Sequence, residues 1–313
     1  MKHLKLTIVA LLWMVPLSVF SQMIRENRQQ KFPKAIPAGN YSGITNMGND
    51  RYAVVCDKSV DGFYVFHIDI DTVTGRIVGV ANEGFCPSGK PNRDQEGIAF
   101  NPFAHTLFIS GEADNQVLEY TTDGQQTGRR LAVPPSLSSR LSHHYGLESL
   151  CYDQVKHCYY TVSERPAQGD SLLRLLALAD DGTMLRQYAY SLDAVKQKHS
   201  GVLVNGVSEL CMLDDGRLLV LERTVRVPRL RIGSYVECRL YEVWPADEER
   251  LQKHLLHKFH TKINLTRRNF ANYEGMCVAK RQDDGRLILL LIADSQNQYK
   301  GVLRDWMKTL IIK

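Results

Sequence analysis

Apolar and polar positions alternate in short blocks along the whole chain, and one arrangement of blocks recurs. A polar step leads into an apolar run, a turn follows, and a second apolar run ends at an acidic residue. The stretch Asn272–Cys277, with Asp294 behind it, shows this outline most fully. Four other stretches repeat it at intervals of roughly 50 to 65 residues: Ser42–Thr45, Glu96–Ala99, Glu148–Cys151 and Ser208–Cys211. Such a period is typical of propeller-like arrays.

Each repeat predicts about four short strands, and the turns between them support this. Asp-Gly pairs such as Asp123-Gly124 and Asp284-Gly285 favour type I′ hairpin turns, because both residues tolerate a positive φ. We read Leu172–Leu178 as a strand, from its place in the repeat, and Pro245–Gln252 as a short helix. Five repeats of four strands predict an all-β protein, a β-propeller with five four-stranded antiparallel blades. Uneven spacing leaves six blades as an alternative.

The first residues have the pattern of a signal peptide. Lys2 and Lys5 precede the apolar run Leu6–Leu17, which is short for a membrane span, and small residues precede a cut before Gln22. The alternative is a membrane anchor. We expect residues 1–21 to be removed and 22–313 to form one exported propeller domain, periplasmic or extracellular and with no membrane span. Within that domain, Gln30–Ile36 is predicted to add an outer strand to the last repeat and close the ring.

Charge and cysteine usage narrow the picture further. The formal net charge of +5 is small and dispersed, so no nucleic-acid partner is indicated. Of the seven cysteines, Cys151, Cys211 and Cys277 occupy one repeat position that takes small packed side chains. We therefore favour buried thiols over disulfides. A Cys151–Cys158 bridge across one hairpin remains the alternative.

Acidic residues recur where the inner strands begin. The first strand of each blade lines a propeller's central channel, so Glu96, Glu148 and Glu274 should surround one mouth. The fourth repeat is ambiguous between Ser208 and Glu209, because a one-residue shift turns a strand side chain to the other face. Five more acids follow the second strands and should reach the same mouth: Asp57, Glu112, Glu164, Glu222 and Asp294.

Carboxylates crowded at one mouth repel one another unless something neutralises them. One candidate is a hard cation such as Ca²⁺, which takes several oxygen ligands. The other is arginine, since Arg165 and Arg223 follow two of the acids and Arg93 precedes Glu96. The alternative to a functional site is that each Glu caps backbone amides or pairs with an arginine between blades.

Weaker signals have ordinary explanations. The segment Asp69–Gly75 resembles a calcium loop only faintly, and a hairpin turn explains it better. His143 and His144 precede the third inner strand but are more typical of a surface loop. The arginines from Arg223 to Arg231 are more typical of a solvated face than of an anion site. Motifs of serine hydrolases and zinc proteases are missing from the sequence.

Short phrases around the acids resemble a known family. These are Asp94–Ala99, Gly146–Leu150, Tyr273–Met276 and Ala293–Ser295. They resemble the phytase-like domain family, described as "esterase-like activity of phytase", which comprises exported bacterial proteins. Carried over by position, the resemblance marks Glu96, Glu148 and Glu274. Ser42 and Ser208 depart from the pattern, so the ring of acids is incomplete.

The resemblance and the acids together imply a metal-dependent phosphoester hydrolase. Ca²⁺ would be held by Glu96, Glu148 and Glu274 with help from Glu112 and Glu164, and it would activate water. Glu148, Arg165 and Arg223 are the expected catalytic residues, the arginines stabilising negative charge. We expect a monomer acting on a small anionic substrate, a phosphoester. The alternative is a non-catalytic propeller that binds a glycan, a peptide or an envelope partner.

Overall fold

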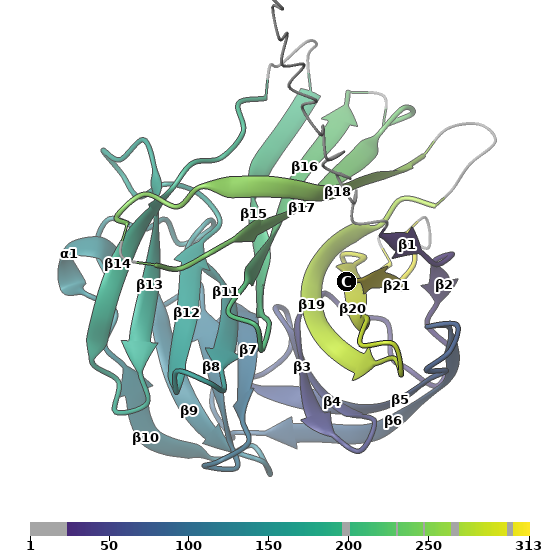
Figure 1. Ribbon diagram of the computed structural model, residues 1–313, viewed down its shortest axis with the longest axis horizontal. Coiled ribbons are helices and arrows are strands. Elements are labelled where there is room, and N and C mark those ends of the chain that lie inside the picture. Colours follow the sequence, from purple (N-terminus) through teal and green to yellow (C-terminus); the bar gives the residue numbers. More distant parts are fainter. Residues whose placement is uncertain (1–23, 196–200, 230, 247, 264–268, 299–302) are drawn as a thin grey trace, which may run out of the picture.

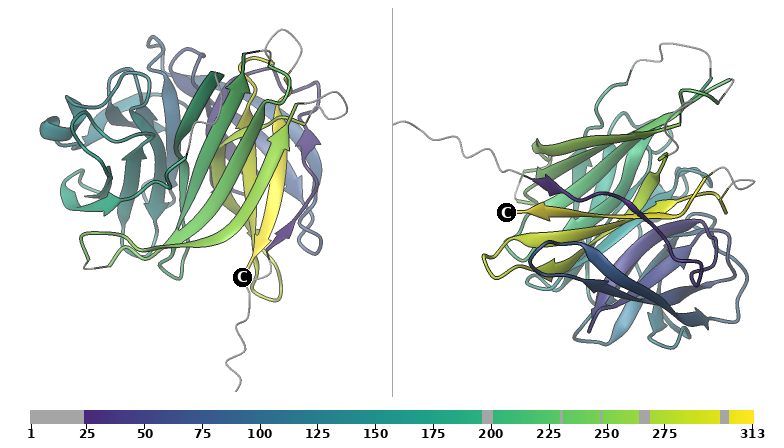
Figure 2. Two further views of the ribbon diagram at one scale, coloured as in Figure 1. Left: turned by 90° about the horizontal axis from the view of Figure 1, so that it is seen from above. Right: turned by 90° about the vertical axis from the view of Figure 1, so that its right-hand side faces the viewer.

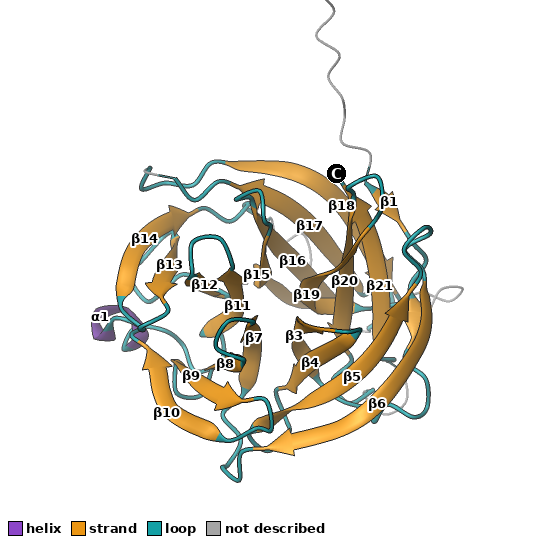
Figure 3. Ribbon diagram, turned by 60° about the horizontal axis from the view of Figure 1, so that its bottom comes forward, coloured by secondary structure: helices purple, strands orange, loops and turns teal. Residues whose placement is uncertain are grey.

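Five sheets stand around a central axis in the computed structural model, which describes residues 24–195, 201–229, 231–246, 248–263, 269–298 and 303–313. Figure 3 shows the sheets as blades of a ring, and Figure 2 shows the same ring from two other sides. The predicted five-bladed propeller is confirmed, with four-stranded antiparallel blades. The signal-peptide prediction falls on residues 1–21, which lie outside the described ranges.

The strands follow one another from the axis outwards in four of the blades, as labelled in Figure 1. The first blade contains β3 (Tyr41–Gly48), β4 (Arg51–Cys56), β5 (Gly62–Ile70) and β6 (Ile77–Pro87). The second contains β7 (Gln95–Asn101), β8 (Thr106–Gly111), β9 (Gln116–Thr121) and β10 (Gln126–Leu131). The third contains β11 (Leu147–Asp153), β12 (Cys158–Ser163), β13 (Leu173–Ala179) and β14 (Met184–Tyr190). The fourth contains β15 (Gly201–Met212), β16 (Leu218–Pro228), β17 (Tyr235–Val243) and β18 (Lys253–Lys262).

The fifth blade joins the two ends of the chain. It contains β19 (Asn272–Arg281), β20 (Leu287–Asp294) and β21 (Trp306–Ile312). Two short N-terminal strands, β1 (Arg25–Glu26) and β2 (Gln30–Lys31), pair antiparallel with β21. Ring closure by the N-terminal segment was therefore predicted correctly. The strands begin earlier and are shorter than the predicted Gln30–Ile36, since residues 33–36 form a turn.

Removing the closing strands should weaken the fifth blade. A chain that starts at Phe32 lacks β1 and β2 and leaves β21 as an open edge, whereas one that starts at Gln22 keeps both strands. We expect the shorter chain to melt roughly 5 to 10 °C lower, because it loses backbone pairing and the Lys308–Glu26 ion pair. Calorimetry of both chains measures this difference. Equal melting temperatures would show that the closing strands contribute little.

The hydrophobic core lies between the blades. Five clusters of buried side chains each connect two neighbouring blades. In the one between the first and fifth blades, Tyr52 and Phe66 pack with Leu290 and Ile311. A neighbouring blade covers each face of a blade. The inner strands therefore carry apolar residues on both faces. Cooperative packing around the ring holds the inner strands at fixed positions.

The Asp-Gly turns differ in type from the prediction. Gly124, Gly182, Gly216 and Gly285 have φ of 98°, 90°, 90° and 85°, but the preceding aspartates have negative φ. The hydrogen bonds Gly124 N–H to Thr121 O and Thr121 N–H to Gln125 O define a three-residue loop. These loops are type I turns followed by a left-handed glycine, which also suit hairpins.

One predicted helix is wrong and one strand is confirmed. The segment Leu173–Ala179 is a strand, as expected. The described residues of 245–252 contain no helix, because Leu251 donates a backbone hydrogen bond to Ala189 and holds the segment extended along β14. The described residues contain one short helix, α1 (Pro135–Ser138), far below the length of a membrane span.

All seven cysteines lie in described segments and are free thiols. Six are buried, and Cys86 is half-buried. Burial raises the pKa of Cys151, Cys211 and Cys277, which keeps these thiols protonated. The prediction of buried thiols is confirmed, and the alternative Cys151–Cys158 bridge is wrong.

Candidate active site

The acidic step of each repeat coincides with a β-bulge. Every inner strand shifts register against its partner at this point, between Gln95 and Ile98 in β7 and between Leu147 and Ser149 in β11. The same shift occurs in the other three inner strands, β3, β15 and β19. Bulges redirect a side chain and are frequent beside active sites. The residues at the bulges are Ser42, Glu96, Glu148, Ser208 and Glu274.

The bulge resolves the fourth repeat in favour of Ser208. The register shift of β15 lies between Val207 and Glu209, so Ser208 takes the position of the acids. The buried Glu209 side chain instead accepts a hydrogen bond from the backbone N–H of Leu210, at 2.9 Å. Burial raises its pKa well above the usual range.

Glycines after two of the bulges allow neighbouring inner strands to approach closely. A Cβ atom on Gly43 would lie 2.2 Å from the carbonyl oxygen of Glu96, and one on Gly97 would lie 2.5 Å from the nitrogen of Leu150. A side chain at either position would therefore force the strands apart. At Glu96-Gly97, a redirected acid is thus combined with tight packing around the channel.

The second set of acids differs from the prediction in the fourth blade. Pairing of Val207 with Glu222 makes Glu222 equivalent to Ser163 and Gly111, each of which lies one residue before an acid. Arg223 therefore holds the position that Asp57, Glu112, Glu164 and Asp294 hold in the other blades. The prediction that Glu222 lies at the mouth is wrong, because β16 continues to Pro228 and alternates its faces. Glu222 accepts hydrogen bonds from Tyr190 and Lys253 instead.

Arg223 lies at the centre of three carboxylates. Its guanidinium contacts Glu148 at 2.9 Å and Glu164 at 3.1 Å, and it also pairs with Glu274. Asn272 accepts a further hydrogen bond at 2.8 Å. Burial opposes the charge of Arg223, but Glu274, Glu164 and Glu148 raise its pKa well above the usual value. One buried cation thus balances only part of the charge of three acids.

Glu96 faces the same ring without a partner. It is only 8% exposed, and no described residue forms a hydrogen bond or ion pair with its carboxylate. Burial raises its pKa well above the usual range, and Glu148 and Glu274 raise it further. The structure therefore brings the three bulge acids to one mouth and leaves Glu96 without a hydrogen bond or ion pair to the described residues.

Two further acids at the mouth are held in a partly protonated range. Glu112 accepts a hydrogen bond from the backbone N–H of Gly146 at 2.6 Å, and burial raises its pKa to about 7. Asp294 is also buried, and this raises its pKa to about 7 although the N–H of Gln296 donates to it. Both groups would ionise more readily if a cation lay nearby.

Three carboxylates at this mouth have a spacing that suits a cation. Oxygens of Asp57, Asp94 and Glu96 lie within 4.8 Å of one another, and Lys58 contacts Asp57 at 2.9 Å and Asp94 at 2.7 Å. The Oδ1 atom of Asp57 is buried without a hydrogen-bond partner. Oxygen ligands at this spacing fit the coordination sphere of Ca²⁺. Asp50, His67 and Asp69 form another such group among the described residues.

The two remaining arginines have different surroundings. The Arg165 guanidinium stacks 3.6 Å from the ring centre of Tyr145 and lies 3.9 Å from Glu164, with 31% of the side chain exposed. From the sequence, Arg93 was a candidate to neutralise the ring of acids, but in the structure it does not contact them. It pairs with Asp114 at 2.7 Å and donates to Tyr120 at 2.9 Å, because its side chain points away from the channel.

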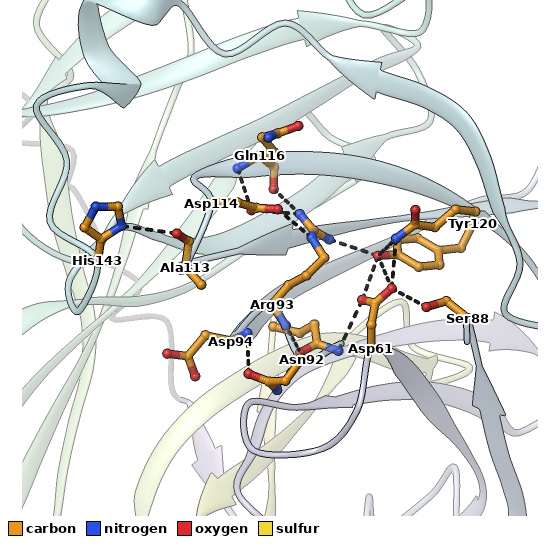
Figure 4. A network of polar contacts seen from close by, with 12 residues as sticks. Asp61, Ser88, Asn92, Arg93, Asp94, Ala113, Asp114, Gln116, Tyr120 and His143 are labelled. Atoms are coloured by element: carbon orange, nitrogen blue, oxygen red, sulfur yellow. Dashed lines mark hydrogen bonds and ion pairs between the residues drawn. The ribbon is translucent and has the colours of Figure 1, made fainter. Parts of the chain in front are cut away.

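A buried network that the sequence did not indicate supports the loop before Glu96 (Figure 4). Asp61 is fully buried and accepts hydrogen bonds from Tyr120 at 2.8 Å and 3.0 Å. The Nε2 atom of Gln95 donates to Asp61 at 3.3 Å, which fixes the residue beside Glu96. Asp61 follows no repeat pattern, so only the fold reveals it. His143 is exposed, and its Nδ1 atom lies 3.1 Å from the carbonyl oxygen of Ala113 (Figure 4).

The faint resemblance of Asp69–Gly75 to a calcium loop has a structural explanation. Asp71 accepts hydrogen bonds from the backbone N–H and the hydroxyl of Thr74, at 2.7 Å and 2.5 Å, within the turn between β5 and β6. The segment Asp69–Gly75 is therefore a hairpin turn, as favoured.

Solved structures with a similar outline are distant in sequence. Hydrazine synthase of Kuenenia stuttgartiensis is 8% identical, with 85% of this chain and 79% of that chain covered and a TM-score of 0.40. The tail fibre of Staphylococcus aureus phage P68 is 10% identical, with 93% and 52% covered and a TM-score of 0.44. A protein from Lactobacillus plantarum is 17% identical, with 72% and 56% covered and a TM-score of 0.35. At these scores the similarities add nothing to the assignment.

The family comparison is more informative. No curated protein matches the chain. A family model described as "Phytase-like: Esterase-like activity of phytase" matches residues 36–296. The matched range contains all five inner strands and every acid of the mouth, from Asp57 to Asp294. The chain therefore belongs to the phytase-like family.

Proposed function

We propose that the protein is an exported, metal-dependent phosphoester hydrolase whose reaction takes place at the acidic mouth. The observation that carries the proposal is Glu96, a buried carboxylate beside Asp57 and Asp94 with no hydrogen bond or ion pair to any described residue. A buried carboxylate of this kind is costly to ionise unless it is paired or coordinates a metal. The family description, which names an esterase-like activity, and the leader-like first residues support the same proposal.

The residues present fit a hard divalent cation. Asp57, Asp94 and Glu96 would hold Ca²⁺, since all three offer carboxylate oxygens and two of them carry raised pKa values through burial. When bound, the cation would attract phosphate oxygens and lower the pKa of a coordinated water. This ligand set differs from the one expected from sequence, because Arg223 already pairs with Glu148, Glu164 and Glu274.

Glu148 is the proposed proton acceptor for the attacking water. Burial raises its pKa well above the usual range, and Glu164 raises it further while Arg223 lowers it. A carboxylate tuned towards neutral pH accepts a proton effectively. Arg223 would position Glu148 through the 2.9 Å contact, and the partly exposed Arg165 would contact substrate oxygens at the rim. The oxygen of water would bond to phosphorus as its proton passes to Glu148. The phosphorus–oxygen bond to the leaving group would break, and the departing oxyanion would take up the proton from Glu148.

The substitution Glu96→Gln tests the proposal. We expect turnover of bis(4-nitrophenyl) phosphate with Ca²⁺ to fall at least about 100-fold, because a bound cation contributes several kcal/mol to such reactions. In chelator the variant should melt higher than the wild type, since the substitution removes a buried carboxyl that is costly to ionise in the folded state. Its melting temperature should also stop responding to Ca²⁺.

The matched control is Glu83→Gln, which changes an exposed glutamate paired with Arg51. It should leave turnover and the response to Ca²⁺ unchanged. Failure of the wild type to hydrolyse phosphomonoesters and phosphodiesters across a panel of divalent cations would refute the enzyme assignment. The non-catalytic alternative, a propeller that binds a ligand at its mouth, would then remain.

A further inference from the structure

An apolar cavity of about 470 Å³ lies beside the acidic mouth, between β16 and the fifth blade. Its apolar wall is formed by Val225, Val227, Ile232, Ile263, Phe270 and Leu303. Its volume falls within the range of small-molecule sites, which are lined mainly by apolar side chains with a few polar groups.

The cavity exists because the fourth blade extends beyond the others. Strands β15 and β16 are paired from Gly201 to Pro228, well past the bulge, and this extension carries Val225 and Val227 above the mouth. Val225 and Val227 are only partly buried, and Ile232 is 60% exposed. Among the described residues, this apolar surface remains accessible to a ligand.

Two residues connect the cavity to the carboxylates. Asn272 lines the cavity, accepts a hydrogen bond from Arg223 at 2.8 Å and donates to Glu274 at 2.7 Å. Asp294 lines it as well and belongs to the second set of acids. A ligand that reaches from the acids into the cavity therefore needs a polar head and an apolar tail.

We propose that this cavity binds the apolar alcohol portion of the substrate, so that the preferred substrates are phosphoesters carrying an alkyl chain. This inference rests on the proposed hydrolase function. Highly phosphorylated polyols lack an apolar group and would leave the Val225 and Phe270 side of the cavity without a partner. The cavity thus selects the substrate class, while the acids at the mouth perform the chemistry.

Two phosphodiesters test the preference. Both carry 4-nitrophenol as leaving group, and the second alcohol is methanol in one and octanol in the other. We expect kcat/KM with Ca²⁺ to be at least about tenfold higher for the octyl ester, because burial of each methylene is favourable. The double variant Val225→Thr/Val227→Thr keeps side-chain shape and should remove most of this preference while leaving the methyl ester unchanged. Val78→Thr, at an exposed valine of β6, is the control.

Binding separates the two proposals. Octylphosphonate should bind more tightly than methylphosphonate in calorimetric titrations with Ca²⁺, and the double variant should weaken only the octyl compound. If the wild type turns over neither ester but shows this binding pattern, the hydrolase proposal falls and the cavity assignment stands. Equal affinities for the two phosphonates, or an octyl preference that survives in the double variant, would overturn the cavity assignment.

Discussion

Replacing Arg223 with methionine should remove a large part of the protein's folding stability at neutral pH. The guanidinium is 9% exposed and pairs with Glu148, Glu164 and Glu274, which are also buried. Its removal leaves three buried carboxylates beside the unpaired Glu96 without their cation. Breaking one buried ion pair commonly costs about 3 to 5 kcal/mol, and total stabilities are about 5 to 15 kcal/mol. We expect urea denaturation to show a loss of at least that size.

Acidic conditions should partly rescue this variant. Burial raises the pKa of Glu148 and of Glu274 well above the usual range, and without the arginine both would protonate more readily. Protonated carboxyls no longer repel, so the variant should be more stable at pH 5 than at pH 7. Arg226→Met on the same strand is the control and should change stability little. A variant as stable as the wild type at pH 7 would show that the acids are already neutral.

Stability of the wild type in chelator should fall as pH rises from about 4.5 to about 7. The pKa values of Glu112 and Asp294 are raised to about 7 by burial, whereas unfolded carboxyls titrate near 4. The folded state therefore binds more protons than the unfolded state in this window, and the free energy of unfolding decreases with pH. At lower pH, Glu26 has the opposite effect on the free energy of unfolding. Its pKa is lowered to about 2, through hydrogen bonding to His257, so its contribution is lost below about 4.5.

Calcium should remove most of this dependence. A cation held by Asp57, Asp94 and Glu96 would favour the ionised form of the neighbouring acids and so oppose the pKa increase caused by burial and by mutual repulsion. It would also stabilise only the folded state. Urea denaturation at several pH values, in chelator and in Ca²⁺, measures both effects. The double variant Glu112→Gln/Asp294→Asn should flatten the slope in chelator. The same slope with and without Ca²⁺ would argue against a cation at the mouth.

The number and kind of elements could be predicted from the chain alone. Apolar runs, glycine-containing turns and the recurring acids specify strands and their order, because these signals are local in sequence. Placement of Glu96, Glu148 and Glu274 at equivalent points follows from the same repeat. Closure of the ring by the N-terminal segment also follows, since the last repeat lacks an outer strand.

Partners and side-chain directions depended on the tertiary structure. The sequence placed Glu222 at the mouth, whereas the structure places its neighbour Arg223 there. A shift of one residue along a strand moves a side chain to the other face, so only the bulge and the pairing of β15 with β16 decide which residue lies at the mouth. Asp61 and its hydrogen-bond donor Tyr120 lie 59 residues apart in the sequence, and no local pattern specifies such a contact.

The same limit explains the wrong helix and the unforeseen cavity. Residues 249–251 are held along β14 by backbone hydrogen bonds to Ala189, and the cavity is lined by both Val225 and Phe270. Both features depend on contacts between distant parts of the chain. The sequence by itself determined the repeat, the strands and the acidic positions, because local periodicity encodes them. Register, the partner of each acid and the shape of the site were decided by how the blades pack around the ring.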